Sequence, residues 1–256
     1  MVPKHSHRPI PTGTIDVTDH PPLLDVDISG ASYGTAQVLH GVSFSMSRER
    51  VAIIGRNGMG KSTLCNVITG LHRDAHGTVE LDGQQVLGRR PMTIGRAGVG
   101  YVPQGRRVFD SLTVDEHFSM LGPRQSDDWP TTAIYDLFPQ LGQRRRSLAR
   151  DLSGGEQQML AISRAVATGP KLLVMDEPSE GLAPLVVDDL IDQCAALFDD
   201  AGIGILVIEQ NLHAALRIAD RVLVMVRGET LTDMSSADFS TRTDLQEAHL
   251  GVSRTT

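Results

Sequence analysis

A glycine-rich segment in the first quarter of the chain limits the folds that this sequence can adopt. Residues 55–63 read GRNGMGKST, follow the apolar run VAII and open a stretch of helical periodicity. The spacing fits G-x-x-x-x-G-K-[ST], with Lys61 and Ser62 at its end. In such a loop, backbone N–H groups surround phosphate oxygens at a helix start whose dipole also favours an anion. A plain glycine turn is the alternative. The strand–loop–helix context favours a phosphate site in which Lys61 reaches the β- and γ-phosphates and Ser62 ligates Mg²⁺.

Two adjacent carboxylates end a second apolar run, LLVMDEP. The run places Asp176 at the carboxyl end of a buried strand, beside the expected phosphate site, where it can hold the hydration shell of Mg²⁺. Glu177 follows directly and is suited to orienting and deprotonating a water molecule. The alternative is a strand that merely ends in acidic turn residues before Pro178, and the phosphate loop makes that alternative the weaker one.

A second glycine-rich helix start occurs in LSGGEQQ, residues 152–158. Ser153 and Glu156 fit a capping box, in which each side chain bonds to the other residue's backbone N–H. A capping box does not explain Gly154 and Gly155, because glycine costs about 1 kcal/mol relative to alanine inside a helix. A second anion-binding helix start does explain them, since a phosphate approaches the backbone closely only where side chains are absent.

Strand and helix signals alternate over most of the chain. The apolar runs KLLVM, GILVIE and DRVLVMV are separated by helical stretches, which predicts an α/β fold with a mostly parallel core sheet. Short alternating runs in residues 23–46, and a turn at Asp82–Gly83, predict an antiparallel β subdomain. Residues 112–152 look helical, with a capping box at Thr113 and Glu116, so we expect a helical subdomain at about 105–155.

Residues 1–22 are rich in Pro, His, Thr and Asp and lack periodicity, which predicts a disordered leader before a folded domain of residues 23–256. The net charge of -7 argues against a dedicated nucleic-acid-binding protein. No apolar run approaches the roughly 18 residues of a membrane helix, and the N-terminus lacks a signal-peptide core. Cys65 and Cys194 lack metal-ligand spacing, so we expect a cytosolic protein whose membrane role, if any, is peripheral.

Together these motifs resemble those of the ATP-binding-cassette (ABC) ATPases, a P-loop NTPase family, over about residues 23–251. In that family the LSGGQ-like signature of one subunit closes over ATP held by the phosphate loop of another, which implies that the protein works in pairs. Tyr33, in SYG, matches the aromatic residue that stacks on adenine, although an ordinary packed tyrosine is the alternative. Gln104, in YVPQ, matches the glutamine that touches Mg²⁺ or the attacking water. The resemblance implies a nucleotide site formed by Tyr33, Gly55, Arg56, Asn57, Gly58, Met59, Gly60, Lys61, Ser62 and Thr63, a metal site formed by Ser62, Gln104 and Asp176, and a signature formed by Leu152, Ser153, Gly154, Gly155, Glu156 and Gln157.

More narrowly, stretches such as YVPQGRRVFDSLTVDEH, DEPSEGLAPLVV and VIEQN resemble the second ATPase subunit of branched-chain amino acid importers and their amide and urea relatives. This resemblance implies MgATP hydrolysis coupled to uptake at the cytoplasmic membrane face. The implied partners are a second ATPase subunit, identical or paralogous, two membrane permease subunits and an extracytoplasmic substrate-binding protein, with no nucleic acid. Phe109, beside Arg106 and Arg107, would face the groove that receives a helix of the membrane subunit, whereas residues 144–146 are expected to form a solvated basic face.

Two departures from the family pattern concern catalysis. Gln210, in VIEQN, stands where most members have a histidine that contacts the γ-phosphate, and His213 is expected on a helix face rather than as its substitute. Ala183, in GLAP, replaces the usual aspartate. With Glu177 as base and Gln104 and Gln210 as further catalytic contacts, we expect an ATPase, but the competence of this subunit's own site stays open. The alternatives are a regulatory cassette that barely hydrolyses ATP and a nucleic-acid-linked ABC ATPase. The sequence names neither the exact substrate nor the pairing partner.

Overall fold

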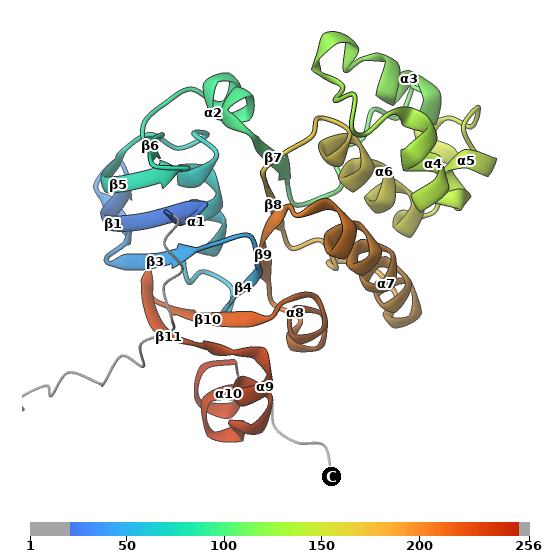
Figure 1. The fold of residues 1–256 in the computed structure, drawn as a ribbon. Coiled ribbons are helices and arrows are strands. Elements are labelled where there is room, and N and C mark those ends of the chain that lie inside the picture. The colour runs from blue at the N-terminus through green and yellow to red at the C-terminus, as the bar shows by residue number, and fades with distance from the viewer. Residues whose placement is uncertain (1–20, 251–256) are drawn as a thin grey trace, which may run out of the picture.

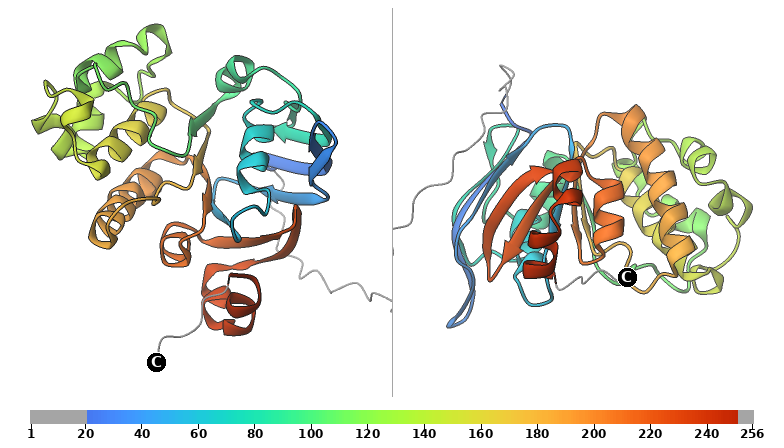
Figure 2. Two further views of the ribbon diagram at one scale, coloured as in Figure 1. Left: turned by 180° about the vertical axis from the view of Figure 1, so that it is seen from behind. Right: turned by 90° about the horizontal axis from the view of Figure 1, so that it is seen from below.

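The computed structural model describes residues 21–250 of the 256-residue chain, except for the side chains of residues 193, 194 and 196–201. The predicted leader, residues 1–22, therefore lies almost entirely outside the described residues. Two sheets pack beside each other, and most of the helices lie on the far side of the larger sheet (Figures 1 and 2). This arrangement confirms the predicted α/β fold.

The larger sheet has six strands in the order β11-β10-β4-β9-β8-β7. In chain order they are β4 (Arg50–Ile54), β7 (Val99–Val102), β8 (Leu172–Asp176), β9 (Gly204–Glu209), β10 (Arg221–Val226) and β11 (Glu229–Ser235). Only β11 runs antiparallel to its neighbour, so the core sheet is mostly parallel, as predicted. The segments that follow β4, β7, β8 and β9 therefore meet at one edge, where ligands of open α/β sheets commonly bind.

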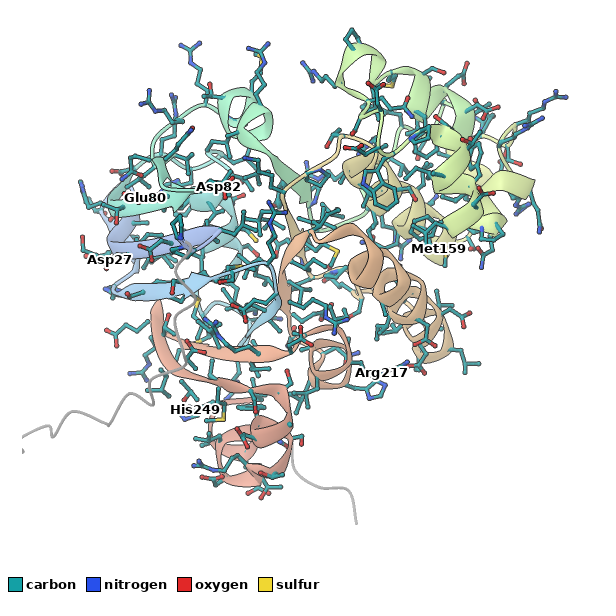
Figure 3. The ribbon with its side chains drawn as sticks, viewed as in Figure 1. Asp27, Glu80, Asp82, Met159, Arg217 and His249 are labelled. Carbon is teal, nitrogen blue, oxygen red and sulfur yellow. The ribbon has the colours of Figure 1, made fainter. Side chains whose placement is uncertain are left out.

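The smaller sheet is antiparallel and centred on β1. Its strands are β1 (Leu24–Tyr33), β2 (Ala36–Leu39), β3 (Val42–Met46), β5 (Ala75–Leu81) and β6 (Gln84–Gln85). Along β1, buried and exposed residues alternate, so that one face packs inward and the other carries acidic side chains. Asp27 and Glu80 lie on this outer face (Figure 3).

Two hydrophobic cores flank β4. Val51 and Ile53 belong to the core shared with helix α1 (Lys61–Ile68) and the antiparallel sheet. Ala52 and Ile54 belong to the core on the opposite face, which the other large helices cover. A strand buried on both faces explains why its sequence is a continuous apolar run.

The remaining helices are α2 (Pro91–Ala97), α3 (Val114–Ser119), α4 (Thr131–Leu137), α5 (Pro139–Gln143), α6 (Gly154–Val166), α7 (Pro184–Ala201), α8 (Leu212–Ile218), α9 (Ser236–Thr241) and α10 (Thr243–Leu250), with 3₁₀ turns η1 (Gly122–Arg124) and η2 (Ala149–Asp151). The predicted helical stretch is thus a series of short pieces, and α3, α4 and α5 gather on one side of α6 (Figure 1). Prolines at the starts of η1, α4 and α5 explain the interruptions there, because proline breaks the helical hydrogen-bond pattern. The capping box at Thr113 and Glu116 is confirmed. Within residues 21–250, no helix has the length and apolar character needed to cross a bilayer.

Candidate functional site

The phosphate-loop segment connects β4 to α1, as the sequence predicts. Gly60 immediately precedes the helix with a φ of 97°, a left-handed conformation that favours glycine. Lys61 is the first helical residue and is 4% exposed. Its Nζ donates hydrogen bonds to the backbone oxygens of Gly55, at 2.8 Å, and Arg56, at 3.2 Å. A buried ammonium group therefore points back into the loop that its own segment forms.

Two carboxylates from the end of β8 meet this loop. The Ser62 hydroxyl donates to Asp176 Oδ1 at 3.2 Å, and Lys61 Nζ lies 3.5 Å from Glu177 Oε1. Asp176 is 3% exposed, and its burial, with a contribution from the nearby Glu177 carboxylate, raises its pKa to about 6 despite the bond from Ser62. A serine hydroxyl and an aspartate carboxylate are oxygen donors of the kind that Mg²⁺ prefers, so these residues fit the expected ion.

Gln104 follows β7 and reaches one of these carboxylates, that of Glu177, and also that of Glu180. Its Nε2 donates to Glu177 Oε2 at 3.1 Å and to Glu180 Oε2 at 2.9 Å. The backbone of Glu177 has a φ of 48°, which is uncommon for a residue with a side chain and indicates a conformation held by its surroundings. Glu180 was not among the residues that the sequence pointed to, because nothing in the sequence alone shows which loop it faces.

Glu209 is a second residue that the sequence reasoning missed. It ends β9, is 1% exposed, and accepts backbone N–H bonds from Ser179 at 2.9 Å and from Gln210 and Asn211 at 3.1 Å each. Burial raises its pKa, although the backbone donors act in the opposite direction. It ends an apolar strand just as Asp176 does, and that pattern could have identified it. The carboxylate holds Gln210, whose side chain is exposed, at the same sheet edge as the phosphate loop.

His213 lies on the outer face of α8, as the sequence predicts. Its Nε2 lies 3.1 Å from Asp188 Oδ1 on α7, and Arg217 also binds Asp188. Figure 3 shows Arg217 on the α8 surface. His213 therefore faces α7 rather than the phosphate loop. Gln210 remains the predicted γ-phosphate contact at this edge of the sheet. Ala183 is exposed and immediately precedes α7.

Tyr33 ends β1 and is 50% exposed. Its ring lies 4.2 Å from that of His72, in the segment after α1, with the two ring planes tilted by 34°. An exposed aromatic ring at this place agrees with a base-stacking role better than with an ordinary packed tyrosine. The role itself stays a prediction.

The signature segment forms the expected capping box. The backbone N–H of Ser153 donates to Glu156 Oε2 at 2.7 Å, and that of Glu156 donates to Ser153 Oγ at 3.3 Å. Among residues 21–250, no hydrogen bond or ion pair joins residues 152–157 to the phosphate loop or to Asp176 and Glu177. The two glycine-rich helix starts are thus separate within one subunit.

Packing within the chain also bears on the two signature glycines, which the sequence argument had assigned only to a ligand. A Cβ on Gly154 would lie 2.9 Å from Nη1 of Arg106. A Cβ on Gly155 would lie 2.3 Å from Cγ1 of Val186, on α7. Close packing against Val186 is therefore a reason for Gly155 besides an anion, whereas the group beside Gly154 is the movable end of Arg106. The anion-binding role of the pair stays a prediction.

The segment after Gln104 carries a half-exposed Phe109, as predicted. Its backbone N–H donates to Nε2 of the buried His117 at 2.9 Å, while the second ring nitrogen of His117 lies 2.7 Å from the Thr113 oxygen. These bonds fit a neutral imidazole, and burial lowers the pKa of His117. The guanidinium of Arg164 stands 5.5 Å from the Phe109 ring centroid. Residues 144–146 are exposed, in agreement with a solvated basic face.

Comparisons with known proteins agree with this geometry. A family model described as ABC transporter matches residues 39–180. The high-affinity branched-chain amino acid transport ATP-binding protein BraG of Pseudomonas aeruginosa is 39% identical over 233 residues, which cover 90% of this chain and 100% of that protein. The probable branched-chain amino acid transport ATP-binding protein LivF of Archaeoglobus fulgidus is 31% identical, covering 87% and 96%. The ADP conformation of an ATP-binding cassette from an ABC transporter has a TM-score of 0.75 at 28% identity, covering 86% of this chain and 94% of that one.

Proposed function

Because this chain belongs to the ABC transporter family and is an ABC-type ATPase subunit of an importer, we propose that it drives uptake of branched-chain amino acids or related amides. The substrate class rests on similarity to proteins whose names carry it. ATP is the nucleotide of the family. Mg²⁺ is proposed as its companion ion.

One observation carries the proposed chemistry, which is that three strands, β4, β7 and β8, deliver the reacting groups to one sheet edge. Lys61, Asp176, Glu177 and Gln104 lie within a chain of contacts of 2.9–3.5 Å, joined by Ser62 and Glu180. We infer that Lys61 and the loop amides bind the phosphates. Because no group of three or more His, Cys, Asp or Glu side chains within residues 21–250 could hold a metal alone, phosphate oxygens would complete the Mg²⁺ site at Ser62 and Asp176, with Gln104 beside it.

Glu177 is proposed as the group that orients and deprotonates the attacking water, and Gln210 as the neutral contact to the γ-phosphate. The remaining proposed nucleotide contacts are Tyr33 and the loop residues Gly55, Arg56, Asn57, Gly58, Met59, Gly60 and Thr63. Burial, and to a smaller extent the Glu177 carboxylate, raises the pKa of Asp176. The bound ion would offset the negative charge gathered at these two carboxylates.

The separation of the signature from the phosphate loop supports a site completed by a second ATPase subunit. We propose that the segment 152–157 of each subunit closes over nucleotide bound to the other. We further propose a peripheral place on the cytoplasmic membrane face, against permease subunits, with a substrate-binding protein on the opposite side. Residues 106–109, with the exposed Phe109, would meet the permease.

The direct test is calorimetric titration of the purified subunit with MgATP. Lys61→Ala should weaken binding by roughly 1.5–3 kcal/mol, the worth of a hydrogen bond to a charged group. Lys171→Ala is the matched control, because Lys171 is an exposed lysine paired with Asp82. Equal affinity of wild type and Lys61→Ala would exclude the proposed phosphate site.

The substrate is tested separately by purifying the complex with its permease and binding protein. A complex whose binding protein holds a branched-chain amino acid or an amide would support the proposal, and one that holds only a sugar or a lipid would contradict it.

A further inference from the structure

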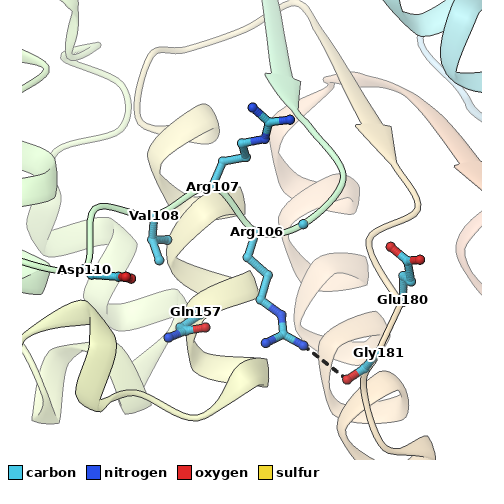
Figure 4. Close-up of a pocket in the computed structure, with 8 residues that line it drawn as sticks. Arg106, Arg107, Val108, Asp110, Gln157, Glu180 and Gly181 are labelled. Carbon is cyan, nitrogen blue, oxygen red and sulfur yellow. Dashed lines mark hydrogen bonds between the residues drawn. The ribbon is translucent and has the colours of Figure 1, made fainter.

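Two loops lie side by side at the edge of the central sheet, one after β7 and one after β8. Gln104, in the first loop, donates to Glu177 and Glu180 in the second, at 3.1 and 2.9 Å. Two residues later, Arg106 donates through Nη2 to the backbone oxygen of Gly181 at 3.1 Å (Figure 4). The loops are therefore tied at two neighbouring positions, and a cavity of about 460 Å³ lies between them.

The chemistry of the Gln104 bonds fixes which end of its amide faces the carboxylates. An ionised carboxylate only accepts hydrogen bonds, and of the two amide ends only the NH₂ group donates. The two hydrogens of Nε2 match the two acceptors Glu177 and Glu180. The amide oxygen must then point away from both carboxylates.

Glu177 alone would fix this orientation less firmly. If residue 180 could donate as well as accept, the amide of Gln104 could turn over and offer its oxygen to residue 180 instead. Glu180 cannot donate while it is ionised. An ionised Glu180 therefore excludes the flipped amide, in which the oxygen of Gln104 would face residue 180.

Arg106 anchors the same loop in a conformation that the backbone does not favour. Arg106 and Arg107 have φ values of 65° and 44°, in the left-handed region that costs roughly 1 kcal/mol or more for a residue with a side chain. Tertiary contacts hold this conformation: Arg106 binds Gly181 and packs against Gly154, and Arg164 donates to the Arg107 oxygen at 2.9 Å. Strained residues held by their neighbours are typical of functional loops.

We propose that Glu180 is a positioning residue, which with Glu177 turns the Gln104 amide oxygen toward the bound cation or water, and that Arg106 anchors the loop that carries Gln104. The proposal rests on the proposed function for the identity of the nucleotide site. It adds two residues, Glu180 and Arg106, to those that the sequence motifs assign to this site.

The test measures ATP affinity of the full chain with Mg²⁺ and, separately, with EDTA. Glu180→Leu removes the acceptor, Glu180→Gln keeps the shape but can donate, and Glu180→Asp is the matched control that keeps the carboxylate. We expect the Mg²⁺-dependent gain in affinity to fall about two- to fivefold in Glu180→Gln and Glu180→Leu, the size of one exposed hydrogen bond to a charged group, and to fall less in Glu180→Asp.

Loss of charge alone gives a different result. Removing a negative charge near the phosphates would by itself strengthen ATP binding, most of all with EDTA, because ATP without Mg²⁺ carries the larger negative charge, and this change would be screened by salt. A change confined to tighter binding with EDTA, or no change while wild type binds MgATP normally, would overturn the positioning role. If wild type itself fails to bind MgATP, the proposed function is what fails.

Hydrogen exchange of residues 104–110 in the protein without added nucleotide is the independent readout. Glu180→Leu and Arg106→Ala should each raise exchange of this segment about two- to fivefold, whereas Arg242→Ala, which removes an exposed arginine between α9 and α10, should not. Unchanged exchange in both loop variants would show that neither residue restrains the loop, and would overturn the proposal whatever the nucleotide result.

Discussion

Replacing Gly155 with alanine should destabilise the contact between α6 and α7. The new Cβ would lie 2.3 Å from Val186 Cγ1, whereas carbon atoms in contact usually lie about 3.5–4.0 Å apart. Val186 is β-branched and on a helix, so it has essentially one preferred χ1 rotamer and cannot swing aside. The helices must therefore separate by more than about 1 Å, as estimated from these contact distances.

The expected cost follows from two opposing effects. Overpacking costs about 1–3 kcal/mol, and alanine regains at most about 1 kcal/mol of helix propensity over glycine. We expect Gly155→Ala to lower the free energy of unfolding by about 1–2 kcal/mol on this balance. Urea unfolding followed by circular dichroism would show this as a lower midpoint with an unchanged slope.

Two further variants separate overpacking from other causes. Gly154→Ala meets the mobile end of Arg106, which can move, so its effect should stay within about 0.5 kcal/mol. Val186→Ala should make room for the Gly155→Ala methyl group, giving a favourable coupling of about 1–2 kcal/mol in a double-mutant cycle. A Gly155→Ala protein as stable as wild type, or strict additivity with Val186→Ala, would refute the packing explanation.

Three other predictions concern the nucleotide site and the helical region. Glu177→Gln should still bind ATP, and its steady-state turnover in the assembled complex should fall about 10²-fold or more, because an amide cannot accept the proton; unchanged turnover would exclude Glu177 as the base. Gln210→His should raise, or at least not lower, single-turnover hydrolysis in a complex whose partner site is disabled, because histidine is the usual contact in the family; a fall of about tenfold would show that glutamine is the better donor here. Burial lowers the pKa of His117, so the stability that neutral His117 contributes is complete above the ordinary histidine pKa of about 6.5 and is lost as pH falls toward the lower folded value. Urea midpoints at pH 7.5 and 5.5 should therefore differ less in His117→Gln than in wild type, and an equal difference would contradict this reading.

The sequence predicted those parts of the site that local signals define. The strand before the phosphate loop, the position of Asp176 at a strand end and both capping boxes depend on residues near each other in the chain, and the structure confirms each of them. The mostly parallel character of the larger sheet was also predicted, because strands that alternate with helices pair in parallel.

Contacts between distant segments could not be predicted in this way. The approach of Arg106 to Gly154, the bond from Gln104 to Glu180 and the bond from Ser179 to Glu209 join residues that are far apart in the chain. Helix α2 also escaped notice, since Pro91–Ala97 has only one buried residue and hence no apolar stripe. Such features arise from the packing of whole elements, which the local pattern does not contain.

The buried Glu209 carboxylate has a consequence for the timing of events at the nucleotide site. It accepts backbone N–H groups from Ser179, after β8, and from Gln210 and Asn211, after β9. Pulling these loops apart would remove the Ser179 donor and leave one oxygen of a buried carboxylate unpaired, which costs roughly 1–3 kcal/mol or more. The two loops should therefore shift in the same kinetic step. A probe on Gln210 and a probe on the Ser179 loop would then relax with one common rate constant after nucleotide is added.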